Sequence, residues 1–164
     1  MKKLAVLCAA AAMTLAGPAF AQSFSPSGAT VTATGATSLT APGFPTLNCA
    51  ATFRGTVNSD GTATITSASF VGGPLGACAL VRLTTPFTLV PTSTTSVNVN
   101  GLEVTAPVSC GPANVSATWA NGTPSHFDIP TATISPGGCT VTAHLTVSGI
   151  VLPNQNAPLD KLIG

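Results

Sequence analysis

Apolar and polar residues alternate along most of the chain, and this pattern predicts β-strands rather than helices. In Cys49–Asn58 the odd-numbered positions are mostly apolar and the even-numbered positions mostly polar. In Cys139–Val147 one parity holds Cys, Val, Ala, Leu and Val, while the other holds Thr and His. A period of two is typical of strands that bury one face. The same pattern predicts further strands over Thr62–Phe70, Val97–Val104, Ala113–Trp119 and Ser125–Ile134.

Short turn signals separate or interrupt these runs. Asp60-Gly61 and Asn121-Gly122 each stand between two alternating segments, and we expect a hairpin at each. Asn100-Gly101 predicts another hairpin within Val97–Val104. Its turn would be of type I′, because both residues accept positive φ. In this arrangement Val99 faces Leu102 across the turn.

About nine or ten short strands with frequent turns predict an all-β fold. The pattern suits a sandwich or a barrel, and we favour a single antiparallel β-sandwich over residues 22–153. Within Thr62–Phe70 the apolar residues change parity after Ile65, so we expect a β-bulge near Thr66–Ser67. We expect Gln22–Ser27 to be a loose tail and residues 154–164 to be a flexible one.

The first 21 residues have the form of a secretory signal peptide. Lys2 and Lys3 are followed by an apolar run, Leu4–Leu15, and then by Ala19-Phe20-Ala21, a small-x-small cleavage site. The run is shorter than the roughly 20 residues that span a membrane, and no later segment is apolar enough to do so. We therefore expect cleavage after Ala21 and export to the extracellular space or outer cell surface, with the periplasm as an alternative.

The four cysteines beyond the leader form two equally spaced pairs. Cys49 and Cys78 are 29 residues apart, as are Cys110 and Cys139. The Asp-Gly and Asn-Gly turns fall at the same offset within the two pairs, so segments 49–78 and 110–139 suggest half-repeats, each a hairpin closed by its own bridge.

An even number of cysteines in an exported chain predicts disulfides. Four cysteines allow three pairings, and the equal spacing favours Cys49–Cys78 together with Cys110–Cys139. No two of these cysteines lie within a few residues of each other, so the close ligand spacing of zinc motifs is missing.

Charged side chains are rare, which excludes several kinds of partner. Typical domains are about 25% charged, whereas only three cations and four acids follow residue 21. The chain has no basic stripe for nucleic acid and no polybasic patch for anionic lipid. The seven residues are Arg54, Arg82, Lys161, Asp60, Glu103, Asp128 and Asp160.

Ser125, His126 and Asp128 are the residue types of a catalytic triad, but their spacing argues against one. Adjacent strand residues point to opposite faces, so Ser125 and His126 cannot converge. His126, Asp128 and His144 would converge as metal ligands if their strands were neighbours. We favour two exposed surface histidines and predict no catalytic site, no metal site and no cofactor.

The remaining candidates also have structural explanations. Asp60 belongs to a turn, and Glu103 faces away from the apolar side of its strand. Trp119, the single tryptophan, has inward parity and is predicted to be core rather than a sugar-stacking platform. Gly72-Gly73-Pro74-Leu75-Gly76 is interpreted as a loop.

A set of segments distributed around the four cysteines carries a family resemblance. They are Thr34–Thr40, Cys49–Val57, Gly61–Phe70, Cys78, Cys110–Pro112, Val115–Trp119 and Pro136–Cys139. Together they resemble the PraB-type activators of alkane oxidation of Gram-negative bacteria. The resemblance spans roughly Ala33 to Val147, and the four-cysteine frame is its most specific part. It implies a secreted, non-enzymatic protein that promotes growth on long-chain alkanes, by hydrocarbon uptake or emulsification.

Three functions follow as hypotheses. The first is a non-enzymatic protein that acts at the cell surface or at an oil–water interface, with hydrophobic substrate or cell-surface components as partners. The second is a fimbrial or biofilm-matrix subunit that self-associates through edge strands. The third is a carbohydrate-binding module, which would need an exposed aromatic platform.

Overall fold

A computed structural model describes residues 22–153, most of which lie in nine β-strands. One 3-10 segment, η1 (Pro74–Leu80), lies between the third and fourth strands. The strands are β1 (Thr30–Thr40), β2 (Leu47–Val57), β3 (Ala63–Val71), β4 (Arg82–Leu83), β5 (Phe87–Pro91), β6 (Ser96–Thr105), β7 (Ser109–Ala120), β8 (Ser125–Ile134) and β9 (Cys139–Ser148).

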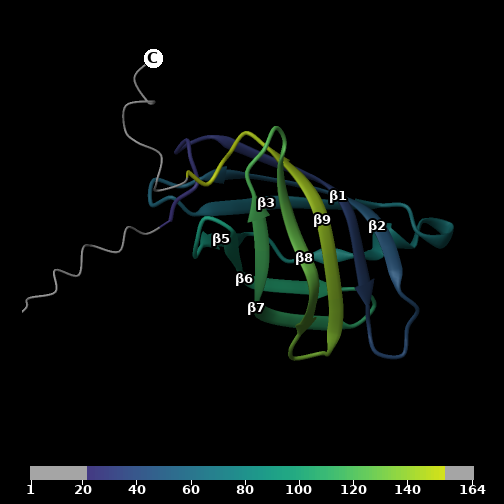
Figure 1. The fold of residues 1–164 in the computed structure, drawn as a ribbon. Helices are drawn as coiled ribbons and strands as arrows, with labels where there is room; N and C mark the ends of the chain where they lie inside the picture. The colour runs from purple at the N-terminus through teal and green to yellow at the C-terminus, as the bar shows by residue number, and fades with distance from the viewer. Residues whose placement is uncertain (1–21, 154–164) are drawn as a thin grey trace, which may run out of the picture.

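Eight of these strands close into an antiparallel barrel (Figure 1). Their order is β6-β5-β3-β2-β1-β9-β8-β7, and β7 pairs again with β6. The two-residue β4 adds to β6 beyond the part that pairs with β5. Two seams are short, because β3 meets β5, and β7 meets β8, over three residue pairs each.

The predicted β-sandwich is therefore wrong, although the all-β prediction is correct. Alternation determines which side chains face inward, and inward faces are alike in a sandwich and in a small barrel. The two architectures differ in whether the outer strands of the two sheets pair with each other. Here they do, at the β3–β5 and β7–β8 seams.

Asn100-Gly101 is a bulge rather than the predicted hairpin turn. Strand β6 runs straight through it, and the register with β7 shifts between Val99 and Leu102. Gly101 has φ 77°, and its N–H donates to Asn114 Oδ1 at 3.2 Å. The extra residue switches the parity, so Val99 and Leu102 are both buried although they differ in parity.

Strands β1, β2 and β3 bend where their sequences allow it. The predicted bulge in β3 is confirmed: Arg54 pairs with Ser67 and Gly55 with Ile65, which leaves Thr66 as the extra residue. A Cβ at Gly55 would overlap the backbone carbonyl oxygen of Thr64 on β3. Gly35 on β1 approaches the carbonyl of His144 in the same way. Glycine in these strands lets neighbouring backbones approach closely, as curved sheets require.

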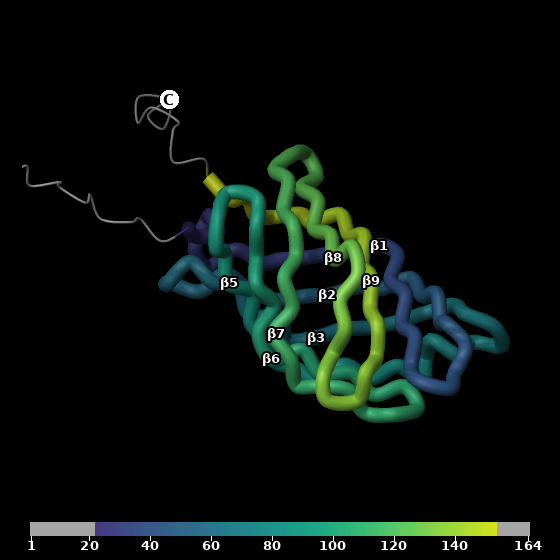
Figure 2. The backbone as a smooth tube through the Cα atoms, turned by 60° about the horizontal axis from the view of Figure 1, so that its bottom comes forward, coloured from purple at the N-terminus to yellow at the C-terminus, as the bar shows by residue number. Residues whose placement is uncertain are grey.

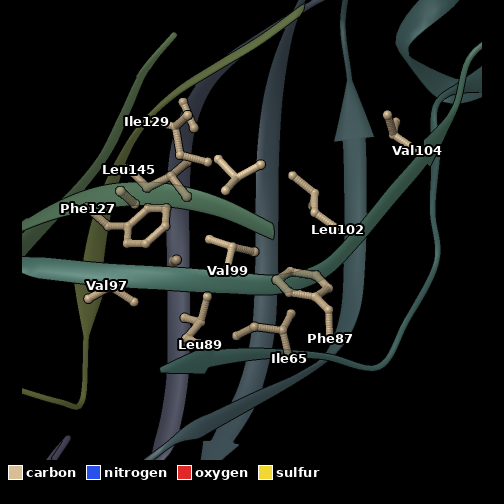
Figure 3. Packing of buried hydrophobic residues seen from close by; sticks show 14 of the residues in the cluster. Ile65, Phe87, Leu89, Val97, Val99, Leu102, Val104, Phe127, Ile129 and Leu145 are labelled. Carbon is tan, nitrogen blue, oxygen red and sulfur yellow. The ribbon is translucent and has the colours of Figure 1, made fainter. Parts of the chain in front are cut away.

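The interior of the barrel is almost entirely hydrocarbon. Side chains from strands across the barrel point toward one another, among them Val99, Phe127 and Leu145 (Figure 3). Within residues 22–153, Ser125 is the only buried polar side chain, and its hydroxyl lies 3.3 Å from the Ile150 carbonyl oxygen. No buried side-chain polar atom in this part of the chain lacks a hydrogen-bond partner.

The first described residues close one end of the barrel instead of forming the predicted loose tail. Phe24 is 2% exposed and packs edge-on against Trp119, with ring centroids 5.1 Å apart. Ser25 exchanges backbone hydrogen bonds with Val151. Trp119 is buried, as predicted, and its indole N–H donates to Asn121 Oδ1 at 2.8 Å. The predicted signal peptide and the tail 154–164 lie outside the described residues.

We predict that Gly55→Ala destabilises the barrel by about 1–3 kcal/mol or more, because the added methyl would push β2 away from the β3 backbone. Urea unfolding of the purified protein measures the loss. Thr56→Ala, on the exposed neighbouring position, is the matched control and should change the free energy of unfolding by less than about 0.5 kcal/mol. Equal effects of the two variants would contradict the role assigned to Gly55.

Candidate functional site: an uncharged end of the barrel

The two ends of the barrel differ in what they carry. The turns β2–β3, β5–β6 and β7–β8 lie at one end, together with residue 22 and residue 153 (Figure 1). The other end holds the β1–β2 loop, the η1 segment, the β6–β7 turn and the β8–β9 turn. In Figure 2 the β1–β2 loop and the η1 segment project together from this second end.

This second end carries no charged side chain in its connections, and we call it the uncharged end. It comprises residues 41–46, 72–80, 106–108 and 135–138, built of Ala, Pro, Gly, Phe, Thr, Leu, Cys, Val and Ser. The nearest charges are Arg82 on β4 and Glu103 on β6. Asp60, by contrast, lies in a turn at the opposite end.

Both disulfides brace the uncharged end, with the pairing that the spacing predicted. Cys49 at the start of β2 is bonded to Cys78 in η1, with Cα atoms 5.7 Å apart. Cys110 on β7 is bonded to Cys139 at the start of β9, with Cα atoms 5.9 Å apart. The second bridge spans the strand ends beside the short β7–β8 seam, and the first fixes the η1 segment beside β3. The two disulfides thus hold together the end of the barrel at which neighbouring strands share the fewest residue pairs.

Large apolar side chains are exposed at this end. Among the described residues, five large hydrophobic side chains are exposed, and four of them lie here. Their relative exposures are 47% for Phe44, 63% for Val71, 108% for Leu75 and 73% for Leu80. The fifth, Val151, is 41% exposed and lies at the opposite end. A cluster of exposed apolar residues at one place on a surface marks a contact site more often than scattered single residues do.

Leu75 is unusual in both its backbone conformation and its exposure. It is the one non-glycine residue in the described chain with positive φ, at φ 53° and ψ 25°. This conformation costs a branched L-residue about 1–2 kcal/mol and is normally left to Gly or Asn. The side chain also gains nothing from burial, because it is fully exposed. Strain and exposure together at one residue are typical of positions kept for function.

The η1 segment is nonetheless well ordered by its own bonds. The Cys78 N–H donates to the Gly72 carbonyl oxygen at 3.2 Å, and the Gly76 N–H donates to Gly73 O at 3.2 Å. Together with the Cys49–Cys78 bridge, these bonds fix the position from which Leu75 projects. Interpretation of Gly72–Gly76 as a plain loop missed this residue, because exposure cannot be read from a segment without alternation.

The interior cavity is too small to be a separate ligand site. It has a volume of about 100 Å³ and is lined by core side chains, including Leu39, Phe87 and Ile129. Binding sites for small molecules are usually about 300–1,000 Å³. The space is therefore a packing void in the core rather than a pocket for a long alkyl chain.

A shallow hollow of about 430 Å³ lies outside the barrel over β1, β2 and β9. Small residues such as Gly35, Ala36 and Ala50 line it, together with His144. No aromatic side chain lines it. Since sugar rings are usually held by stacking on exposed aromatic residues, this hollow lacks the platform that a carbohydrate-binding module needs.

His126 and His144 are both exposed, as favoured from the sequence, and the alternative convergence with Asp128 occurs only in part. β8 and β9 are neighbours, and His144 Nδ1 lies 2.8 Å from Asp128 Oδ1. Both side chains are open to solvent, at 66% and 39% exposed, and His126 is exposed beside them. Within residues 22–153 no group of three or more His, Cys, Asp or Glu residues could hold a metal ion. Ser125 is buried and separated from this face, so no triad geometry arises.

Asp60 has a structural role in the β2–β3 turn. Its Oδ1 accepts hydrogen bonds from the Thr62 hydroxyl at 2.7 Å and from the Thr62 N–H at 2.9 Å. The hydroxyl contact first, and then the backbone contact, hold the pKa of the Asp60 carboxyl below its usual value. Glu103 is half-buried on β6. None of the helical segments within the described chain is long and apolar enough to cross a membrane.

We predict that each disulfide contributes about 3–4 kcal/mol to the free energy of unfolding, because each closes a loop of the same length. The double variants Cys49→Ala/Cys78→Ala and Cys110→Ala/Cys139→Ala should therefore lose similar amounts in urea unfolding. A loss below about 1 kcal/mol for either pair would show that its bridge does not constrain the chain. Peptide mapping of the unreduced protein should find no Cys78–Cys110 link.

We predict that the exposed His144–Asp128 pair is nearly neutral for stability. His144→Ala and Asp128→Asn should each change the free energy of unfolding by less than about 0.5–1 kcal/mol, since solvent screens the pair. Ser125→Ala is the contrasting variant, and it should cost about 1 kcal/mol or more because the Ile150 carbonyl loses a buried donor. A larger loss for His144→Ala than for Ser125→Ala would indicate a role we have not assigned.

Comparison with protein families identifies a match over most of the chain. The family model described as "Alkane oxidation protein activator PraA/PraB-like" matches residues 1–152. No curated protein and no solved structure matches the chain.

Proposed function

Because the chain belongs to the PraA/PraB-like family of alkane oxidation protein activators, we propose that it promotes alkane oxidation without catalysing a reaction, as an exported protein that acts at the oil–water interface or the cell surface. The observation that carries this proposal is the uncharged end. It offers exposed Phe, Val and Leu side chains on a barrel that carries little charge elsewhere.

The positions of the titratable and hydroxyl side chains support a non-enzymatic role. The titratable contact between His144 and Asp128 lies on an open strand face, and the hollow that His144 lines is shallow rather than enclosed. General acid–base catalysis needs such groups within reach of a substrate held in a pocket. Ser125, the serine nearest to them in sequence, is buried and directed at backbone carbonyls.

The surface chemistry favours adsorption at an apolar phase. The described chain carries Arg54, Asp60, Arg82, Glu103 and Asp128, while its outward strand positions are dominated by Thr, Ser and Ala. Hydroxyl-bearing residues cost less to dehydrate than charged ones. Apolar area moved from water into oil is worth about 25 cal/mol per Å². A protein of this kind needs no single deep pocket to act on hydrocarbon.

Export is consistent with both the leader and the disulfides. Two structural disulfides are stable in an oxidising compartment and rare in the cytosol. Lys2, Lys3 and Ala19–Ala21 have the charge and the cleavage-site residues of a signal peptide. We place the mature protein outside the cell or on its surface, where liquid alkane is first met.

The matrix-subunit alternative rests on edge strands. Closure of the barrel pairs eight strands on both sides, leaving the two-residue β4 and the unpaired stretches beside the short seams. Self-association through an open sandwich edge is therefore less favoured than the sequence pattern alone indicates.

The test uses the purified mature chain, residues 22–164, added to hexadecane in water. We expect interfacial tension to fall and droplets to persist, in proportion to protein concentration and oil area. A strain lacking the gene should grow poorly on hexadecane and normally on a soluble carbon source. The matrix-subunit function would be favoured instead by three results together. The protein would leave the interfacial tension unchanged, and the deletion strain would grow normally on alkane but lose its biofilm.

A further inference from the structure

We infer that the uncharged end is the face that inserts into the alkane phase, with Leu75 and Leu80 as its leading side chains. This inference rests on the proposed function and adds an orientation to it. The barrel would stand on the oil surface with the η1 segment and the β1–β2 loop in contact with hydrocarbon. The opposite end, closed by Phe24 and Trp119, would face water.

The distribution of charged residues favours liquid alkane as the phase that the uncharged end contacts. Liquid alkane has no charge and no hydrogen-bonding group, so it favours a contact surface without charged residues. All four connections of this end meet that condition. Anionic membranes, by contrast, are bound by clusters of about four to eight cations. In the described chain Arg82 is the cation beside this end, and it stands alone.

The shape of the end also suits a liquid. Phe44, Leu75 and Leu80 project from two separate loops rather than lining a groove. A folded protein partner would need a surface complementary to these projections. A liquid surface deforms around them and needs no such fit. The Cys49–Cys78 bridge keeps the loop that carries Leu75 in place, so little conformational entropy is lost on insertion.

The first experiment compares partitioning of the full mature protein onto hexadecane droplets. The variant Leu75→Asn/Leu80→Ser removes both leading side chains, and Asn tolerates the positive φ at position 75. We expect the partition ratio to fall about tenfold for each leucine lost. Val151→Ser, which removes an exposed apolar side chain at the opposite end, is the matched control and should leave the ratio within about twofold.

A second readout reports orientation directly. Trp introduced by Leu75→Trp should be quenched by 1-bromohexadecane droplets, and its emission should shift to the blue. Trp introduced by Val151→Trp should show neither change. Trp119 is buried at the opposite end, with 2% of its surface exposed, so its emission reports in each variant whether the barrel is folded.

The outcomes separate the two proposals. If the unmodified protein fails to adsorb to hexadecane, action at the oil–water interface is excluded from the proposed function, and this inference fails with it. If it adsorbs but the double leucine variant adsorbs equally, the proposed function stands and the orientation is overturned. Preferential binding to vesicles of anionic phospholipid over hexadecane would overturn the assignment of alkane as the phase that this end contacts. So would a dimer in sedimentation that dissociates on Leu75→Asn/Leu80→Ser, because the end would then be a contact between copies.

Discussion

Closure of eight strands around a hydrocarbon interior is the constraint on which the rest of this structure depends. The buried inward positions of the strands are apolar apart from Ser125, and the strands of the ring pair with a neighbour on both sides. The ring is thinnest at the β3–β5 and β7–β8 seams, with three residue pairs each. Glycines at 35 and 55 and the bulges in β3 and β6 supply the curvature that brings the first and last strands of the ring together.

Different interactions stabilise the two ends of the barrel. At the end near residues 22 and 153, Phe24 and Trp119 fill the opening, and Asn121 bonds the Trp119 indole and the Leu152 backbone. At the other end two disulfides brace strand ends that pair little, and the loops there bury only small residues, Ala41, Cys78 and Ala106. Those loops expose Leu75 and Leu80 instead.

The barrel does not bring its titratable pair and its interior void together in one site. Its exposed titratable pair on β8 and β9 is solvated, and its interior void of about 100 Å³ is part of the core. What distinguishes the molecule is where charge is missing and where apolar side chains remain exposed.

The sequence by itself determined the facing of residues, the cysteine pairs and the scarcity of charge. Alternation is a local pattern of period two, so it predicts that Cys49, Trp119 and Leu145 face inward wherever their strands pair. Family membership was also within reach, because the four-cysteine frame is a sequence feature. The outcome of Asn100-Gly101 was not, since Gly101 takes a positive φ both in a turn and in this bulge, and the pairing of β6 with β5 and β7 along its length decides which of the two forms. Barrel closure and the exposure of Leu75 were likewise decided by the tertiary structure, because both depend on contacts between segments far apart in the chain.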